Sequence, residues 1–168
     1  MKKFIVLLTD FNNDFYIGQM KGVIKKINPD AEIIDLCHSI RPQDILHASI
    51  VLSKSYKYFP KGSIFVCVVD PTVGSEREIL LVKTNFYMFL VPNNGLITEV
   101  INNEKKYSVY KVRNTKFFLP VISNTFHGRD IFSPVSAYLS NGVSINKICE
   151  RFEKTKIVRL HYINSEVR

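Results

Sequence analysis

The chain has 168 residues, of which 46% are hydrophobic and 23% charged, as in a folded globular domain and unlike a disordered segment. No apolar run approaches the ~20 residues that span a membrane, and the run after Met1 ends at Thr9-Asp10 without a signal-peptide cleavage site. The net charge of +8 is spread among acids with no basic arm, so we expect a cytoplasmic protein that binds neither membranes nor nucleic acid.

Strands and helices are predicted to alternate in the first half of the chain. Continuous apolar runs, typical of strands buried on both faces, predict strands over residues 4–8, 32–36 and 63–69. Apolar residues at helical spacing predict a helix over residues 16–28, which Pro29 ends. A second helix is expected to begin after Pro42-Gln43-Asp44 and to end before Pro60.

Shorter elements are predicted in the second half. Residues 79–84 and 86–91 are expected to form neighbouring strands joined by a tight turn at Asn85. We then expect a short helix over residues 96–101, an edge strand over 107–112, a helix over 129–140 and a last strand over 157–160. This order predicts an α/β fold with three α/β/α layers around a mainly parallel, Rossmann-like sheet. The sequence holds neither a GxGxxG motif after the first strand nor a Walker lysine loop, so it lacks a dinucleotide or nucleoside-triphosphate fingerprint.

Three polar stretches each combine a charged or titratable side chain with a Gly, Pro or Asn at or just after the end of an apolar run. They are Thr9-Asp10, the stretch from Asp70 to Arg77, and residues 125–130, which include His127. In open α/β sheets, ligands bind outside the carboxyl ends of the strands. We therefore expect the three stretches to assemble into one site, and we interpret the protein as an enzyme.

Each of these residues also has a structural interpretation. Asp70 would be costly to bury alone, and Arg77 could turn back to pair with it, so the two could simply form an ion pair that holds the loop. Asp10 could cap a turn, and His127 could be a structural histidine beside the flexible Gly128.

Other polar groups are interpreted as structural. Asp35 and His38 are expected to form a structural pair after the second strand. The three cysteines have no CxxC spacing and are expected to be buried thiols, not disulfides or zinc ligands. The densest basic and aromatic stretch, residues 54–61, fits the solvated end of a helix; a nucleic-acid patch there would predict steeply salt-dependent binding.

Eight motifs resemble those of one family in the family's order, and they cover residues 4 to about 142. The family is the S-adenosylmethionine (SAM) hydrolases, or SAM hydroxide adenosyltransferases, which are related to fluorinases and chlorinases. The motifs are Thr9-Asp10-Phe11, Gly18-Gln19-Met20-Lys21-Gly22, Asp35-Leu36-Cys37-His38, Pro42-Gln43-Asp44-Ile45, Phe59-Pro60-Lys61-Gly62, Val69-Asp70-Pro71-Thr72-Val73-Gly74, Pro92-Asn93-Asn94-Gly95-Leu96 and Thr125-Phe126-His127-Gly128-Arg129-Asp130-Ile131-Phe132.

The resemblance implies hydrolysis of SAM to adenosine and L-methionine by attack of water or hydroxide on the ribose C5′, with no cofactor and no metal. In the family an Asp, an Arg and a His surround the attacking water, and they match Asp70, Arg77 and His127 here. The halogenases of the family carry other residues at the positions of Asp70 and His127. The resemblance therefore implies a hydrolase.

Five further residues are candidates to bind the substrate, three of them from the resemblance. The carboxylate that matches Asp10 holds the ribose hydroxyls, and Thr125 and Phe126 match residues that line the nucleoside pocket. The turn residues Asn93 and Asn94 could present backbone or amide groups to a ligand, and Asn93 stands where the family usually has Asp.

Family members continue into a second, β-barrel domain that packs on the neighbouring subunit of a trimer and contacts adenine and methionine. We therefore expect residues 1–160 to be the N-terminal catalytic domain, residues 161–168 to be a tail at the start of a missing second domain, and the assembly to be a homotrimer. The alternative is a truncated nucleoside- or SAM-binding domain with weak or no catalysis. The loop after Asp10 is one residue shorter than usual, which leaves the role of Asp14 open.

Overall fold

A seven-stranded sheet forms the centre of the structure, a computed structural model that describes residues 3–12 and 15–161. The strands are β1 (Phe4–Thr9), β2 (Glu32–Cys37), β3 (Ile64–Val68), β4 (Ile79–Thr84), β5 (Met88–Pro92), β6 (Tyr107–Val112) and β7 (Cys149–Arg151). The α-helices are α1 (Phe15–Ile27), α2 (Ile45–Ser55), α3 (Thr98–Asn103), α4 (Ser133–Ser140) and α5 (Ile145–Ile148). In the part of the chain that the structure describes, no helix is both long and apolar enough to span a membrane.

The sheet is mixed, in the order β2-β1-β3-β5-β4-β6-β7. The strands β2, β1, β3 and β5 are parallel, whereas every pair from β5 to β7 is antiparallel. The predicted α/β class is confirmed, but the expectation of a mainly parallel sheet is wrong. The cause is the tight turn at Asn85, where the Thr84 N–H donates to the Tyr87 carbonyl at 2.9 Å, because so short a connection joins antiparallel strands only.

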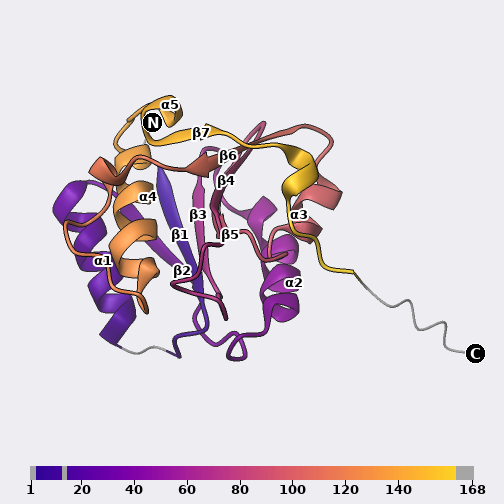
Figure 1. The fold of residues 1–168 in the computed structure, drawn as a ribbon, viewed down its shortest axis with the longest axis horizontal. Helices are drawn as coiled ribbons and strands as arrows, with labels where there is room; N and C mark the ends of the chain where they lie inside the picture. The colour runs from indigo at the N-terminus through magenta and orange to yellow at the C-terminus, as the bar shows by residue number, and fades with distance from the viewer. Residues whose placement is uncertain (1–2, 13–14, 162–168) are drawn as a thin grey trace, which may run out of the picture.

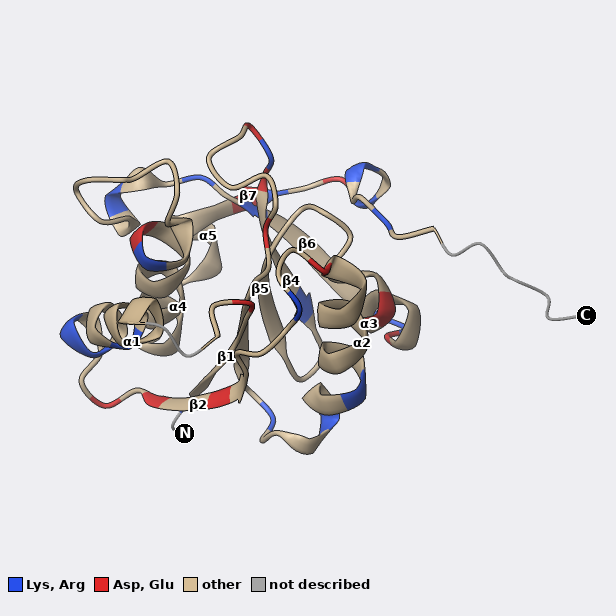
Figure 2. Cartoon of the chain, turned by 90° about the horizontal axis from the view of Figure 1, so that it is seen from below, with Lys and Arg blue, Asp and Glu red and all other residues tan. Residues whose placement is uncertain are grey.

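Helices cover both faces of the sheet, as predicted. Figure 1 shows α1 and α4 on one face and α2 and α3 on the other, and the view from below in Figure 2 shows the same layers. Side chains alternate along a strand, so β1 supports both layers. Its residues Ile5 and Leu7 belong to the core beside α1 and α4, whereas Val6 and Leu8 belong to the core beside α2 and α3.

The C-terminal part differs from the prediction in two places. β6 is not an edge strand, because β7 pairs with it and sets Cys149 opposite Val112. Residues 157–160 form no strand, since only Arg159 makes an isolated bridge, to Gly95. A side chain holds this segment instead: the Asn93 Oδ1 accepts a hydrogen bond from the backbone N–H of Val158 at 2.9 Å.

The helix predicted over residues 129–140 begins with an irregular turn. Gly128–Phe132 forms a π-helix, and the regular helix α4 starts only at Ser133. The Gly128 carbonyl accepts two hydrogen bonds from Ser133, one from its backbone N–H and one from its hydroxyl at 2.7 Å, which hold the wider turn closed. Single π-turns of this kind are frequent at functional sites.

Candidate functional site

Asp10 and Asp70 follow the ends of two neighbouring strands, β1 and β3. β1 ends at Thr9 and β3 at Val68, and these two residues are partners in the parallel ladder. The residues that follow therefore leave the sheet at the same carboxyl edge. The Asp10 carboxylate accepts a hydrogen bond at 2.8 Å from the backbone N–H of Gln43, whose φ of 62° lies in the left-handed region.

Asp70 and Arg77 form a nearly buried ion pair. The Asp70 Oδ2 accepts hydrogen bonds from the Arg77 Nε, at 2.6 Å, and from the Arg77 Nη2. The side chains are only 2% and 9% exposed, respectively, so the pair is shielded from water. The Asp70 Oδ1 has one long hydrogen bond, from the Thr72 hydroxyl at 3.3 Å, and so keeps accepting capacity for a further donor.

The loop between Asp70 and Arg77 depends on Gly74. This residue has a φ of +82°, and a Cβ built on it would lie 2.2 Å from the carbonyl oxygen of Asn124. Only glycine permits this close approach. The contact joins the loop that carries Arg77 to the segment that carries His127, so two distant parts of the chain are held together at the site.

His127 touches the same guanidinium. The Arg77 Nη2 lies 3.3 Å from the His127 Nδ1. A guanidinium can only donate, so Nδ1 holds a lone pair, and a neutral ring must carry its proton on Nε2. Burial and the adjacent Arg77 charge lower the pKa of His127 below its ordinary value of 6.5, against the weaker opposing influence of Asp70, of Asp130 and of a hydrogen bond between the ring and the Ser123 backbone. The imidazole is therefore neutral at pH 7.

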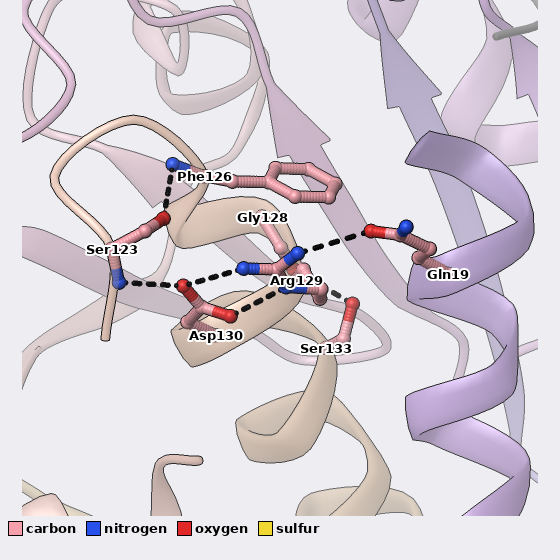
Figure 3. Close-up of polar contacts among 7 residues, drawn as sticks. All are labelled: Gln19, Ser123, Phe126, Gly128, Arg129, Asp130 and Ser133. Carbon is pink, nitrogen blue, oxygen red and sulfur yellow. Dashed lines mark hydrogen bonds and ion pairs between the residues drawn. The ribbon is translucent and has the colours of Figure 1, made fainter. Parts of the chain in front are cut away.

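A buried carboxylate holds the segment before His127 in place. The Asp130 side chain is 1% exposed, accepts a hydrogen bond from the Ser123 backbone N–H at 2.8 Å and pairs with the Arg129 Nε at 2.7 Å (Figure 3). The Ser123 hydroxyl oxygen in turn accepts from the Phe126 N–H at 2.9 Å. Burial alone would raise the pKa of Asp130, but the hydrogen bonds from Arg129 and Ser123 outweigh it and keep the pKa below its ordinary value.

Phe126 is buried and packs against two other aromatic rings. Its ring centre lies 4.8 Å from that of Tyr16 and 5.6 Å from that of Phe11, both in edge-to-face geometry. The Arg129 guanidinium carbon lies 5.0 Å from the Phe126 ring centre, and Arg129 also reaches Gln19 on α1 at 3.1 Å (Figure 3). These contacts tie the start of α1 to the site.

A cavity of about 50 Å³ lies among these groups. Five of the predicted site residues line it, namely Asp10, Asp70, Thr125, Phe126 and His127. Arg77 does not line the cavity and acts from behind through its contacts with Asp70 and His127. A water molecule occupies roughly 30 Å³ of liquid, so the cavity has room for water.

Asn93 and Asn94 do not line this cavity. The Asn93 amide nitrogen donates to Glu78 at 3.1 Å, and its oxygen binds the C-terminal segment. The Asn94 amide nitrogen donates to the Val69 carbonyl at 2.9 Å, and its oxygen accepts from the Leu96 N–H. Both amides thus bind the chain itself in this structure.

A chain of hydrogen bonds next to Asp10 was not predicted from the sequence. The Thr9 Oγ1 lies 2.8 Å from the His38 Nδ1, and the His38 Nε2 lies 3.0 Å from the Asp35 Oδ1. The Thr9 hydroxyl oxygen also accepts from the Phe11 N–H at 3.2 Å. The spacing of Asp35 and His38 predicted a structural pair, and the structure shows that this pair braces the turn that presents Asp10.

The described residues include no group of three His, Cys, Asp or Glu side chains placed to hold a metal ion. The cysteines are free thiols; Cys67 and Cys149 are buried, as predicted, and Cys37 is half-buried. Burial raises the pKa of Cys149 to about 12, so this thiol stays protonated at neutral pH. Asp14 lies outside the described residues.

Comparisons with known proteins agree on one family. The family model for the SAM hydroxide adenosyltransferase N-terminal domain matches residues 5–149. An (R)-S-adenosyl-L-methionine hydrolase of Methanocaldococcus jannaschii is 39% identical over 94% of this chain and 62% of its own length. A fluorinase of Nocardia brasiliensis is 24% identical over 97% of this chain and 62% of its own length.

A solved structure is similar over the same region. The crystal structure of an uncharacterized conserved protein from Thermotoga maritima matches with a TM-score of 0.89 and 37% identity, over 94% of this chain and 60% of that one. The chain thus spans about three fifths of the length of these relatives.

Proposed function

Because this chain belongs to the SAM hydroxide adenosyltransferase family, we propose that it hydrolyses S-adenosyl-L-methionine to adenosine and L-methionine. The observation that carries the proposal is the contact of one guanidinium, Arg77, with both Asp70 and His127 beside a cavity with room for water. Such an arrangement suits the holding of one water molecule in a fixed direction.

The reaction balances without a cofactor. The water oxygen forms a bond to the ribose C5′ while the C5′–S bond breaks, and its electron pair stays on sulfur. The positive sulfonium becomes the neutral thioether of methionine, so the leaving group needs no proton. The water loses one proton, and the site must accept or release it. The main tasks of the protein are therefore to hold the water in line at about 3–3.5 Å and to exclude bulk solvent.

Asp70 is the better acceptor for a hydrogen bond or proton from the water. The His127 Nδ1 lone pair already faces Arg77, and in the neutral ring Nε2 carries a proton. His127 is thus suited to donate to the water and orient it, in exchange for its hydrogen bond with the Ser123 backbone, whereas the Asp70 Oδ1 can accept a donor beside its long hydrogen bond from Thr72. We assign orientation to His127, acceptance to Asp70, and positioning of both to Arg77.

The substrate would bind over the cavity and not within it, since about 50 Å³ cannot hold a nucleoside. We assign the ribose hydroxyls to the Asp10 carboxylate and the nucleoside to Thr125 and Phe126, which line the same cavity. Asn93 and Asn94 are assigned to the substrate because their turn could present amide groups to a ligand, and these amides would have to exchange their present partners to reach it.

Hydrolysis is favoured over halogenation by charge. The Asp70 carboxylate lines the cavity and would repel a halide ion held at van der Waals distance within it. Water is neutral and can donate to the carboxylate instead. A fluorinase is among the relatives, and for this reason halide must be included in the activity test.

The assembly and setting are proposed on the family resemblance. We propose a cytoplasmic homotrimer that needs neither metal nor cofactor, in which residues 1–160 form the catalytic domain. Further contacts to adenine and methionine would come from a second domain of a neighbouring subunit.

The test is to incubate the protein with SAM in water labelled with heavy oxygen, with chloride present, and to analyse the products by mass spectrometry. We expect methionine and adenosine with the label on the 5′ oxygen, and no product from the Asp70→Ala variant. Chloroadenosine would contradict the assignment as a hydrolase. Binding of SAM or adenosine in calorimetry without any release of methionine would indicate a nucleoside-binding domain.

A further inference from the structure

A second, larger cavity lies at the opposite end of the sheet from the candidate site. Its walls include Lys3 before β1, Gly62 before β3 and Met88 at the start of β5, so it opens at the amino ends of three parallel strands. No residue lines both cavities. Its volume is about 630 Å³, within the range of roughly 300–1,000 Å³ that is usual for small-molecule sites.

The charge on this cavity has one sign. Lys3, Lys61 and Lys83 line it, and among the described residues no Asp or Glu does. The Lys3 Nζ donates to the Leu139 carbonyl at 3.3 Å, and no carboxylate among the described residues pairs with it. Lys83 is exposed on β4, and its ammonium group has no partner among the described residues. Three ammonium groups without neutralising acids attract an anion.

An aromatic ring stands at the same cavity. Phe86 is 50% exposed, and the Lys61 Nζ lies 4.0 Å from the centre of its ring. The lysine covers one face of the ring, and a planar group can stack on such a partly exposed aromatic side chain. Further apolar groups complete this wall, contributed by Met88, Leu139, Val143 and Ile145.

Neutral donors stand between the lysines and the apolar wall. The side chains of Asn85, Ser144 and Asn146 line the cavity and make no hydrogen bond within the described chain. The cavity thus offers a cationic part, a set of neutral polar groups and an apolar part, in one continuous surface.

We propose that this cavity binds an organic phosphate with a planar ring, of the size and chemistry of a nucleoside monophosphate. The phosphate would lie among the lysine ammonium groups, the ring against Phe86, and the sugar hydroxyls beside the amide and hydroxyl side chains. An inorganic anion would leave the apolar wall in water, and an uncharged ring would leave the lysines unpaired. A ligand that carries both groups satisfies both parts of the cavity.

The proposal is tested with uridine 5′-monophosphate, because this probe has the phosphate and a ring but no adenine for the candidate site. In an NMR titration we expect the amide signals of Gly62 and Gly142, which line the second cavity, to shift with the probe. The signals of Gly74 and Gly128, at the candidate site, should stay in place. Uridine and inorganic phosphate alone should each bind more weakly.

Matched variants identify the groups. Lys83→Glu should weaken binding by about tenfold or more, because a charged hydrogen bond is lost; Lys26→Glu, on the exposed side of α1, changes the net charge equally and should have no effect. Phe86→Ala should weaken binding by about tenfold through lost stacking. Tyr58→Ala is its control, since Tyr58 is 88% exposed and does not line the cavity.

Three results would overturn the proposal. They are a failure of the probe to bind at millimolar concentration, a shift of the amide signals of the candidate site instead, and cavity variants that bind the probe as their controls do.

Discussion

The Arg77 side chain contacts two of the groups that line the small cavity, the Asp70 carboxylate and the His127 ring. Because the guanidinium donates to the His127 Nδ1, it fixes the tautomer of the ring as well as its orientation. The ring then has a proton to give at Nε2 and no free lone pair to take one. One residue behind the site thus determines which of its two neighbours donates and which accepts.

His127→Gln and His127→Ala distinguish donation from proton acceptance. If His127 orients the water by donating, the glutamine amide replaces part of that hydrogen bond, and kcat should exceed that of the alanine variant by about tenfold. If the ring instead removes the proton, both variants should lose activity equally. The measurement is steady-state release of adenosine, with circular dichroism to check that both variants fold.

The pH profile should have an acid limb set by His127. Its pKa is lowered in the folded protein, so the ring is neutral at pH 7 and gains a proton only as the pH falls through that lowered value, below 6.5. A protonated ring would place two cations side by side at Arg77. We therefore expect kcat to be constant around neutral pH and to fall in acid. An NMR titration of His127 that gave a pKa of 6.5 or above would contradict this.

At the scale of the elements, two loops are joined by the contact between Gly74 and the Asn124 carbonyl. Gly142 provides a natural comparison, because its φ of +89° is similar but nothing lies within 4 Å of a Cβ built there. An alanine at either position is strained by roughly 1 kcal/mol from its positive φ. Only Gly74→Ala adds a collision with backbone.

Gly74→Ala should therefore lose activity as well as stability, whereas Gly142→Ala should lose stability alone. For Gly74→Ala we expect an unfolding free energy lower by about 2–4 kcal/mol and a lower kcat, because the loop that carries Arg77 must move. Urea unfolding and adenosine release are the two measurements. Equal effects in the two variants would show that the packing of the loops does not position Arg77.

Asp130 stabilises the π-helical turn that precedes α4. Its folded pKa is below the unfolded value of about 3.8, so its stabilisation is complete above that pH and is lost as the pH falls through the lowered folded pKa. Asp130→Asn should lower the unfolding free energy at neutral pH by about 1–3 kcal/mol. The variant should also lose less stability than the parent between neutral pH and acid. Parallel unfolding curves at both pH values would disprove this role.

At the scale of the whole molecule, the two candidate binding sites lie at opposite ends of the sheet. The carboxyl ends of the parallel strands carry the candidate site, and the amino ends carry the larger cationic cavity. Figure 2 shows basic and acidic segments interspersed along the described chain, whose net charge is +8 over the full sequence. Three of its lysines line the second cavity.

The C-terminal segment is attached to this sheet by side chains more than by a strand ladder. The Asn93 side chain binds the Lys156 carbonyl at 3.3 Å and the Val158 N–H at 2.9 Å. Asn93→Ala should speed amide hydrogen exchange at Val158. The N–H of Leu160 donates to the Thr98 hydroxyl at 2.9 Å and is the internal control. Its exchange rate should change less between the variant and the parent than that of Val158. Unchanged protection at Val158 would contradict this attachment.

Local patterns in the sequence determined the class of the fold and the family. Apolar runs identified β1 and β3 within a residue or two, because strands buried on both faces are almost entirely apolar. The same patterns misjudged the end of the chain, where β7 has only three residues and its Cys149 is the only buried one. A strand of three residues is too short to show an alternating pattern. In residues 157–160, the apolar side chain of Ile157 packs into the core without forming a strand.

The sequence predicted only part of the arrangement of side chains at the site. The strand-end positions of Asp10 and Asp70 followed from local patterns, since a polar residue after a buried strand marks the sheet edge. The tertiary structure alone brought Arg77 to His127, fifty residues further along the chain, and thereby fixed the tautomer of the ring. It also decided that the amides of Asn93 and Asn94 bind the chain, and that three lysines from separate segments share one cavity. Such distances between side chains depend on how the loops pack, and no local property of the sequence encodes them.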